Sequence, residues 1–253
     1  MKLYNIVFSP TGGTKQVADC FTGALEGDVT TVDLTDSKQD FRTVSLTKED
    51  VAVISVPSYG GRVPAVVAER LGMVHGNGAR AVLVCVYGNR AYEDTLVELE
   101  DTAKQAGFQV IAAVAAVAEH SIARQFAAGR PDVQDAKQFA AFAQQIQNKL
   151  STGASSEPAL PGNRPYKKAG RAGMVPKPTK DCTRCGVCAA ECPVQAISKE
   201  DPKKVDEKAC ISCMRCIAVC PQGARKVNSV MLSAASLMLK KVCSERKECE
   251  LFL

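Results

Sequence analysis

The first 150 residues alternate between short apolar runs and longer amphipathic stretches. The apolar runs are continuous rather than alternating, which is typical of parallel strands buried on both faces. They cover residues 3–8, 29–34, 51–56, 81–86 and 110–117. Helical spacing of apolar residues predicts helices at 14–25, 64–71, 92–106 and 131–150. Strands that alternate with helices in this way predict an α/β fold, a five-stranded parallel doubly wound sandwich.

The periodic pattern stops after residue 150. Residues 151–180 are rich in Pro, Gly, Ser and Lys, which predicts a linker or an extended arm along the surface. Residues 181–228 are dense in cysteine and internally repeated, and they predict a second, small domain. Residues 229–253 predict an amphipathic C-terminal helix that packs on its own chain. No run of about 18 apolar residues occurs, so we expect no membrane span.

Cysteine and charge are both distributed unevenly. Ten of the twelve cysteines lie after residue 180, and the chain shows no secretory signal. These features favour metal or redox chemistry over disulfides and a cytoplasmic location. Residues 1–150 carry a net charge of −3 and residues 151–253 a net charge of +8. Because the positive half is also the cysteine half, the overall charge of +5 is no sign of a nucleic-acid partner.

Two cysteine runs share the pattern C-x2-C-x2-C-x3-C-P. They read CTRCGVCAAECP at 182–193 and CISCMRCIAVCP at 210–221. This is the spacing of bacterial [4Fe–4S] sites, in which the fourth cysteine of each run ligates the other cluster. One predicted ligand set is therefore Cys182, Cys185, Cys188 and Cys220. The other is Cys210, Cys213, Cys216 and Cys192.

A double zinc module is the alternative for these runs, although eight cysteines exceed what one zinc ion needs. Cys243 and Cys249 fit neither run, and we interpret them as ordinary thiols. Residues 180–227 resemble a two-cluster bacterial ferredoxin. The resemblance implies a small α+β domain that holds two [4Fe–4S] clusters and passes single electrons without substrate chemistry of its own.

The turn between the first strand and the first helix reads SPTGGT. Hydroxyls, glycines and the free N–H groups of a helix N-terminus suit a phosphate. The turn is not a P-loop, because no Gly-Lys-Ser/Thr follows. Its glycine spacing also differs from that of dinucleotide-binding folds, although Asp33 lies at the distance where such folds have the acidic residue that binds the ribose. The predicted phosphate-binding residues are Ser9, Thr11, Gly12, Gly13 and Thr14.

Two further loops follow the third and fourth strands, at the same edge of the sheet. They read PSYGGRVP at 57–64 and YGNRAYED at 87–94. Glycines let the backbone approach a ring edge, and tyrosines offer flat surfaces for stacking. The predicted cofactor-binding residues are Pro57, Ser58, Tyr59, Gly60, Gly61, Tyr87, Gly88, Asn89, Arg90 and Tyr92.

Ser-x-Thr-Gly-x-Thr together with these two loops resembles a flavodoxin. The resemblance implies bound FMN, with Tyr92 as the stacking tyrosine and Tyr59 as its partner from the other loop. Arg62 and Arg90 stand where simple flavodoxins tend to be acidic. They either raise the flavin potential or are solvated charges at the rim. His120, just past the fifth strand, is either a catalytic proton donor or a structural hydrogen-bonding residue.

The whole chain resembles a fusion, found mainly among anaerobes, of a flavodoxin-like domain with a two-cluster ferredoxin. The resemblance implies transfer of single electrons between two [4Fe–4S] clusters and FMN. It also implies a ferredoxin-like donor and a redox protein as acceptor. The alternative is a ferredoxin-fed flavin-dependent reductase of a small electrophile such as a quinone. An NAD(P)H-fed reductase is a weaker possibility, since the sequence shows no nicotinamide site.

Overall fold

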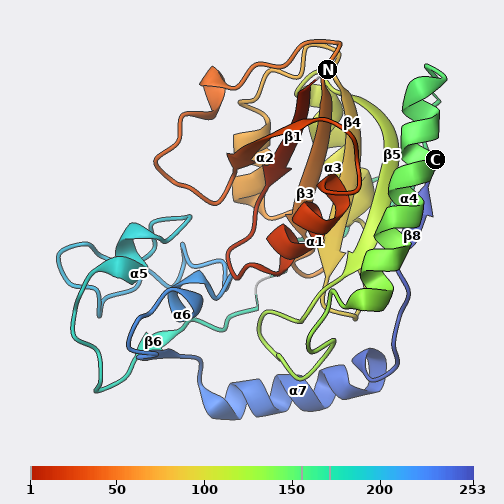
Figure 1. Cartoon of the computed structure of the whole chain (residues 1–253). Coiled ribbons are helices and arrows are strands. Elements are labelled where there is room, and N and C mark those ends of the chain that lie inside the picture. Colours follow the sequence, from red (N-terminus) through yellow and green to blue (C-terminus); the bar gives the residue numbers. More distant parts are fainter. Residues whose placement is uncertain (1, 155, 171) are drawn as a thin grey trace.

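A single twisted sheet forms the centre of the larger domain (Figure 1). The computed structural model describes residues 2–154, 156–170 and 172–253. The sheet has six strands in the order β2-β1-β3-β4-β5-β8. Their bounds are β1 Lys2–Val7, β2 Asp28–Asp33, β3 Val51–Pro57, β4 Arg80–Tyr87, β5 Gln109–Val117 and β8 Glu250–Phe252. The first five strands are parallel, in the flavodoxin-like order 2-1-3-4-5, which confirms the predicted doubly wound sheet.

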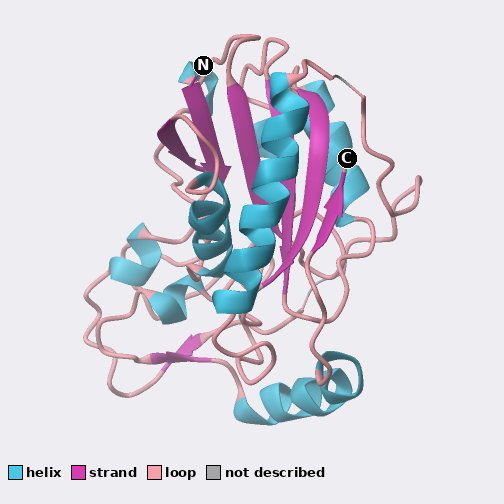
Figure 2. Cartoon of the chain, turned by 45° about the vertical axis from the view of Figure 1, so that its right-hand side comes forward, coloured by secondary structure: helices cyan, strands magenta, loops and turns pink. Residues whose placement is uncertain are grey.

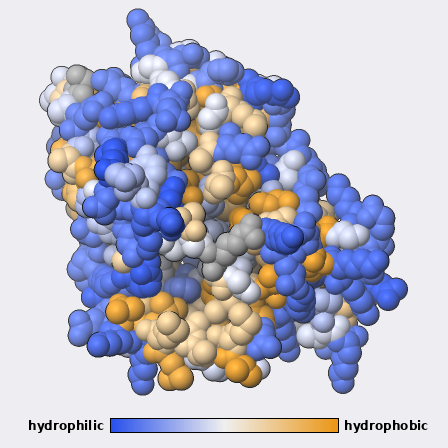
Figure 3. Space-filling model, turned by 180° about the vertical axis from the view of Figure 1, so that it is seen from behind, coloured by the Kyte–Doolittle hydropathy of each residue, from blue (hydrophilic) through white to orange (hydrophobic). Residues whose placement is uncertain are grey.

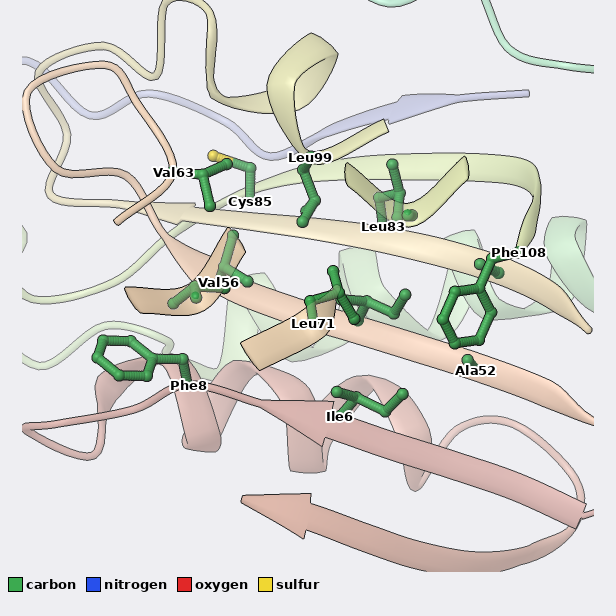
Figure 4. Close-up of a cluster of buried hydrophobic side chains, with 14 of the residues drawn as sticks. Ile6, Phe8, Ala52, Val56, Val63, Leu71, Leu83, Cys85, Leu99 and Phe108 are labelled. Carbon is green, nitrogen blue, oxygen red and sulfur yellow. The ribbon is translucent and has the colours of Figure 1, made fainter. Parts of the chain in front are cut away.

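Helices cover both faces of this sheet. The helices are α1 Gly13–Thr22, α2 Ala65–Leu71, α3 Thr95–Gln105 and α4 Val133–Ser151, and a short 3-10 turn spans Phe41–Thr43. Helices α1 and α4 contact each other on one face, which is turned forward in Figure 2, and α2 and α3 contact each other on the opposite face. Every residue of β3 except the last is buried, because the side chains on both faces of this strand are covered by helices. Figure 4 shows part of the core beneath α2 and α3, to which Phe8, Leu71 and Leu99 belong.

The C-terminal segment differs from the predicted helix over 229–253. Helix α7 spans Ser229–Cys243 and ends there, and β8 then adds to β5 as an antiparallel edge strand. The polar run 244–248 offers no apolar stripe for a helix to bury. Its Arg246 instead pairs with Asp132 at the start of α4, at 2.7 Å. Strand β8 then packs Leu251 against the cluster under α1 and α4.

The small domain begins earlier than residue 181. It contains β6 Lys177–Pro178, α5 Val187–Ala190, α6 Arg215–Ala218 and β7 Arg225–Lys226. Strands β6 and β7 pair in antiparallel fashion, and the N–H of Thr179 donates to the carbonyl of Ala224. Because these bonds tie residues 177–179 to the end of the second cysteine run, the predicted arm ends at about residue 176. The predicted α+β character of the small domain is confirmed.

Helix α7 lies apart from the sheet (Figures 1 and 2). The expectation that its apolar side chains pack on the chain is wrong for most of them: Val230, Leu237 and Met238 are 76%, 73% and 79% exposed. Leu239 and Cys243 pack with Ala123 and Phe126 of the loop that follows β5. Figure 3 shows the resulting apolar surface along the lower edge of the molecule. Within the described ranges, no helix combines the length and the apolar character needed to span a membrane.

Candidate cofactor sites and the surface between them

The eight cysteines of the two runs line two separate small cavities. The cysteines of one cavity are Cys182, Cys185, Cys188 and Cys220. The cysteines of the other are Cys192, Cys210, Cys213 and Cys216. In each cavity three cysteines come from one run and the fourth comes from the other. The structure therefore gathers the same two sets of four that the sequence predicts as ligands.

The local structure repeats around the two cavities. Helices α5 and α6 are each four residues long and are each preceded by a left-handed residue, Gly186 with φ 81° and Met214 with φ 62°. The N–H of Ala196 donates to Cys192 Sγ at 3.3 Å, and the N–H of Ala224 donates to Cys220 Sγ at 3.3 Å. Hydrogen bonds to the sulfurs are among the features that set the potential of an iron–sulfur cluster. The sulfur of the fourth cysteine in each run thus accepts an equivalent backbone hydrogen bond.

Burial makes three thiols of the second cavity poor acids in the absence of metal. It raises the pKa of Cys213 and of Cys216 to about 12, and it raises the pKa of Cys210 as well. A metal ion must therefore displace protons to bind, which it does by supplying the charge that the apolar walls lack. Each cavity offers four soft thiols, which are more deeply buried in the second cavity than in the first, where Cys185 is exposed, and this chemistry fits an iron–sulfur cluster.

The phosphate loop leads into the N-terminus of α1. Gly12, the N-cap residue, has φ 95° and offers no side-chain hydrogen bond, and the first turn of α1 contains no acidic residue. Ser9 Oγ accepts the N–H of Lys15 at 2.8 Å, so this hydroxyl closes the loop around the helix start. The free N–H groups of the first turn and the positive end of the helix dipole suit a dianion. The arrangement fits the terminal phosphate of a mononucleotide.

The loops after β3 and β4 are fastened to each other. Ser58 Oγ and Thr95 Oγ1 lie 2.7 Å apart, and the N–H of Asp94 donates to the carbonyl of Gly61 at 3.1 Å. Gly61 has φ 82°, and a Cβ there would lie 1.8 Å from the carboxylate of Glu93. Glycine is therefore required at this contact for both reasons. The two predicted flavin loops form one continuous surface at the rim that also carries the phosphate loop.

The two arginines of these loops are neutralised by glutamates. Arg62 forms a bidentate pair with Glu98, with nitrogen–oxygen distances of 2.6 and 2.7 Å. Arg90 pairs with Glu93 at 3.1 and 3.0 Å. The Arg62 side chain is only 18% exposed, so it is not a solvated charge at the rim, whereas the Arg90 side chain is 35% exposed. Each positive charge is matched locally, which reduces its effect on a neighbouring flavin.

The aromatic and amide side chains of the second loop turn toward the C-terminal segment. The rings of Tyr87 and Tyr92 pack edge to face with centroids 5.2 Å apart, and Tyr92 Oη donates to Glu250 Oε1 at 3.1 Å. Asn89 Nδ2 donates to the carbonyls of Cys243 and Glu245. The side chain of Asn89 thus holds the end of α7. Any contact of Asn89 with a cofactor must therefore be made by its backbone.

His120 packs directly on the loop after β4. Its Nδ1 accepts the N–H groups of Ile122 and Ala123 at 3.2 and 3.1 Å. Burial lowers the pKa of His120, so the ring is neutral at pH 7 and carries its proton on Nε2. The structure gives this histidine the structural hydrogen bonds of the second interpretation. A role as proton donor would have to use Nε2.

The cysteine domain is docked on the rim that carries the flavin loops. Arg215, next to Cys216, donates to the carbonyl of Pro10 in the phosphate loop at 3.3 Å. Arg70 of α2 donates to the carbonyl of Pro193 at 2.5 Å. Ile211 and Tyr59 both pack against the core beneath α2 and α3. Burial and, second, the neighbouring Cys213 raise the pKa of Tyr59, which places the second cysteine cavity beside this loop.

The predicted arm is anchored on α3 and on the second flavin loop. The buried carboxylate of Asp94 accepts the N–H of Asn163 at 2.8 Å and the N–H of Lys167 at 2.7 Å. The bond from Lys167, aided by those from Asn163, holds the pKa of Asp94 below its usual range despite burial. Arg164 pairs with Asp101 at 2.8 Å. The sequence analysis did not single out Asp94, although its place just before a helix is a signal for a hydrogen-bonding carboxylate.

Comparison with known proteins agrees with the two-domain architecture. A family model described as a 4Fe-4S dicluster domain matches residues 181–224. Ferredoxin-2 of Chlorobaculum tepidum is 44% identical over 55 residues, which cover 19% of this chain and 89% of that protein.

Solved flavodoxins match the other end of the chain. A flavodoxin from the domain Archaea is 13% identical, covers 60% of this chain and 99% of its own, and has a TM-score of 0.41. The Streptococcus pneumonia TIGR4 flavodoxin is 22% identical, covers 57% and 99%, and has a TM-score of 0.38. Through its cysteine domain the chain belongs to the 4Fe-4S dicluster ferredoxins, and it joins that domain to a flavodoxin-like one.

Proposed function

We propose that the protein transfers single electrons between two [4Fe–4S] clusters and FMN, with reduced ferredoxin as the electron donor. The observation that carries the proposal is the docking of two four-cysteine cavities on the rim of the flavin loops, through Arg215 and Ile211. An electron-transfer flavo-iron–sulfur protein needs its redox groups close together and shielded from water. The contact between the domains provides that proximity within one chain.

The proposed cluster ligands are the two sets of four cysteines that line the cavities. The proposed FMN site uses Ser9, Thr11 and the N–H groups from Gly12 to Thr14 for the phosphate, and the loops at 57–62 and 87–92 for the ring. Iron–sulfur clusters exchange one electron at a time, whereas a flavin can hold two. The chain's own residues bind and orient these groups, and Tyr59 of the first flavin loop packs against the same core cluster as Ile211 of the second cysteine run.

A ferredoxin-fed reductase of a small electrophile, such as a quinone, is the second candidate. A groove with apolar walls favours it, because the groove adjoins Asn89 of the second flavin loop and is lined by Phe126, Leu232 and Leu237. In that case Nε2 of His120 is the proposed proton donor. The groove distinguishes the two candidates: a reductase loses turnover when Phe126 is replaced by alanine, whereas a carrier retains its rate of electron transfer to a protein acceptor.

The donor is tested by an anaerobic titration of the protein loaded with clusters and FMN. Reduced ferredoxin should bleach the visible absorption of the clusters and the flavin, while NADH and NADPH should leave it unchanged. Stoichiometric bleaching by a nicotinamide would overturn the proposal and indicate a hydride site. Failure of purified, reconstituted protein to bind both iron and FMN would overturn the cofactor assignment itself.

A further inference from the structure

Arg225 is a charged side chain in the interior of the small domain. It belongs to β7, follows the second cysteine run by five residues and is only 2% exposed. Its Nη1 donates to the carbonyl of Pro176 at 3.2 Å, and its Nη2 donates to the carbonyl of Pro202. Among the residues that the structure describes, no carboxylate pairs with it, and its buried Nε has no hydrogen-bond partner. Two carbonyl oxygens satisfy some N–H groups, but they do not balance a full positive charge.

Arg225 lies between the two groups of cysteines. It is part of the wall of the cavity lined by Cys182, Cys185, Cys188 and Cys220. It also reaches the other cavity, because the carbonyl that accepts its Nη1 belongs to Pro176, which lines the cavity of Cys192, Cys210, Cys213 and Cys216. A guanidinium at this place faces both proposed cluster sites from inside the domain.

Burial of an unpaired charge is strongly unfavourable, so such a group needs a counter-charge. A [4Fe–4S] cluster with four thiolates is an anion and becomes more negative when it accepts an electron. We propose that Arg225 is the buried counter-charge of the two clusters and that it raises the reduction potential of at least one of them. This inference rests on the proposed cluster ligands, and it adds a residue that sets how readily the clusters are reduced.

The sequence pattern alone does not point to this residue. Arg225 lies outside both cysteine runs, beside the exposed Lys226. An exposed lysine acts on a cluster through water and salt, which screen it over about 10 Å at 0.1 M ionic strength. The buried guanidinium acts through protein, where a unit charge at short range changes the binding of another unit charge roughly tenfold or more.

The test is a redox titration of four variants that separate charge from hydrogen bonding. Arg225→Met removes both, Arg225→Gln removes the charge but keeps an N–H donor, and Arg225→Lys keeps the charge with a different donor geometry. Lys226→Met is the matched control for an exposed charge. Iron and sulfide content are measured first, and the cluster potentials are then measured anaerobically with dithionite and mediator dyes, with electron paramagnetic resonance as the readout.

We expect Arg225→Met and Arg225→Gln to lower the potential of at least one cluster. The expected change is at least a tenfold decrease in the equilibrium constant for uptake of one electron, which is about 59 mV. The shift should persist at high salt, and Arg225→Lys and Lys226→Met should remain close to the unmodified protein. Potentials that are unchanged in fully loaded Arg225→Met would overturn the inference and leave the cluster assignment intact.

Loss of clusters from a variant is also decisive. If Arg225→Met and Arg225→Gln lose iron while Arg225→Lys retains it, the charge is what the clusters require and the inference stands. If Arg225→Lys loses iron equally, the hydrogen bonds to Pro176 and Pro202 are the essential feature and the inference fails. If the unmodified protein binds no clusters, the proposed function fails together with the inference.

Discussion

Replacing Gly88 by alanine tests how closely the second flavin loop packs on His120. A Cβ at Gly88 would lie 2.6 Å from His120 Cδ2 and 2.8 Å from both Cβ and Cγ of that residue. The backbone of Gly88 is not left-handed, so the substitution tests steric overlap alone. His120 has little freedom to move away, because its Nδ1 accepts two backbone N–H groups and its own N–H donates to the carbonyl of Phe126.

The cost of this overlap follows from the ways in which it can be relieved. Overpacking of a well-packed site costs about 1–3 kcal/mol. If the histidine ring rotates instead, the two bonds at Nδ1 are lost, at about 0.5–1.5 kcal/mol each. Both routes predict a loss of about 1–3 kcal/mol. For a chain of this size the melting temperature should fall by roughly 2–4 °C for each kcal/mol.

Thermal unfolding of the FMN-loaded protein measures this effect, and NMR of the histidine ring nitrogens shows which route is taken. Gly170→Ala is the matched control, because a Cβ at that position has no atom within 4 Å and the backbone is not left-handed. A melting temperature for Gly88→Ala equal to that of Gly170→Ala would refute the packing of His120 on this loop. FMN affinity should also fall, since relief of the overlap displaces the loop that we propose holds the ring.

Three further predictions concern the proposed ligands and the arm. Cys188→Ser should lose one cluster, so that iron falls from about eight to about four atoms per chain, whereas Cys243→Ser should retain all of it, as iron analysis would show. Tyr92→Ala should weaken FMN binding roughly tenfold by fluorescence titration, because a stacked aromatic pair contributes about 0.5–1.5 kcal/mol beyond its area. The lowered pKa of Asp94 means that its contribution to stability is present above pH of about 4 and is lost as pH falls through the lower folded value. Asp94→Asn should therefore accelerate proteolysis of the arm near Lys167 at pH 7, and equal cleavage rates would contradict this anchor.

The sheet and its helices could be predicted because their signals are local. Continuous apolar runs mark strands that are covered on both faces, and all five runs became β1 to β5. The edge strand β8 could not be predicted in the same way. It contains three residues, and its partner β5 lies more than 130 positions earlier in the chain. A pairing of that kind depends on where the chain returns, which no local pattern encodes.

The candidate sites divide along the same line. The grouping of the cysteines into two sets was predictable, because the spacing of a short repeat limits which sulfurs can meet. The ion pair of Arg62 was not predictable, because α2 and β4 lie between Arg62 and Glu98 and the sequence does not show which residues of the loop and of α3 meet. Asn89 shows the same limit: its position suggested a cofactor contact, whereas its amide holds the end of α7.

The docking of the two domains depends partly on the arm that joins them. The direct contacts are hydrogen bonds from arginines to the carbonyls of Pro10 and Pro193. Because every residue has a backbone carbonyl, the sequence does not show where such contacts form. Residues 152–176 join α4 to β6, and when fully extended they could span roughly 85 Å. The anchor of Lys167 on Asp94 leaves only residues 168–176 between this anchor and β6, and these residues reach roughly 30 Å. Because effective concentration falls as about the −3/2 power of linker length, this anchor raises the concentration of the cysteine domain at the flavin rim about fivefold. A few weak polar contacts can then hold the domains together, so the arm contributes to the docked state through its length as well as through Pro176, which lines the second cysteine cavity.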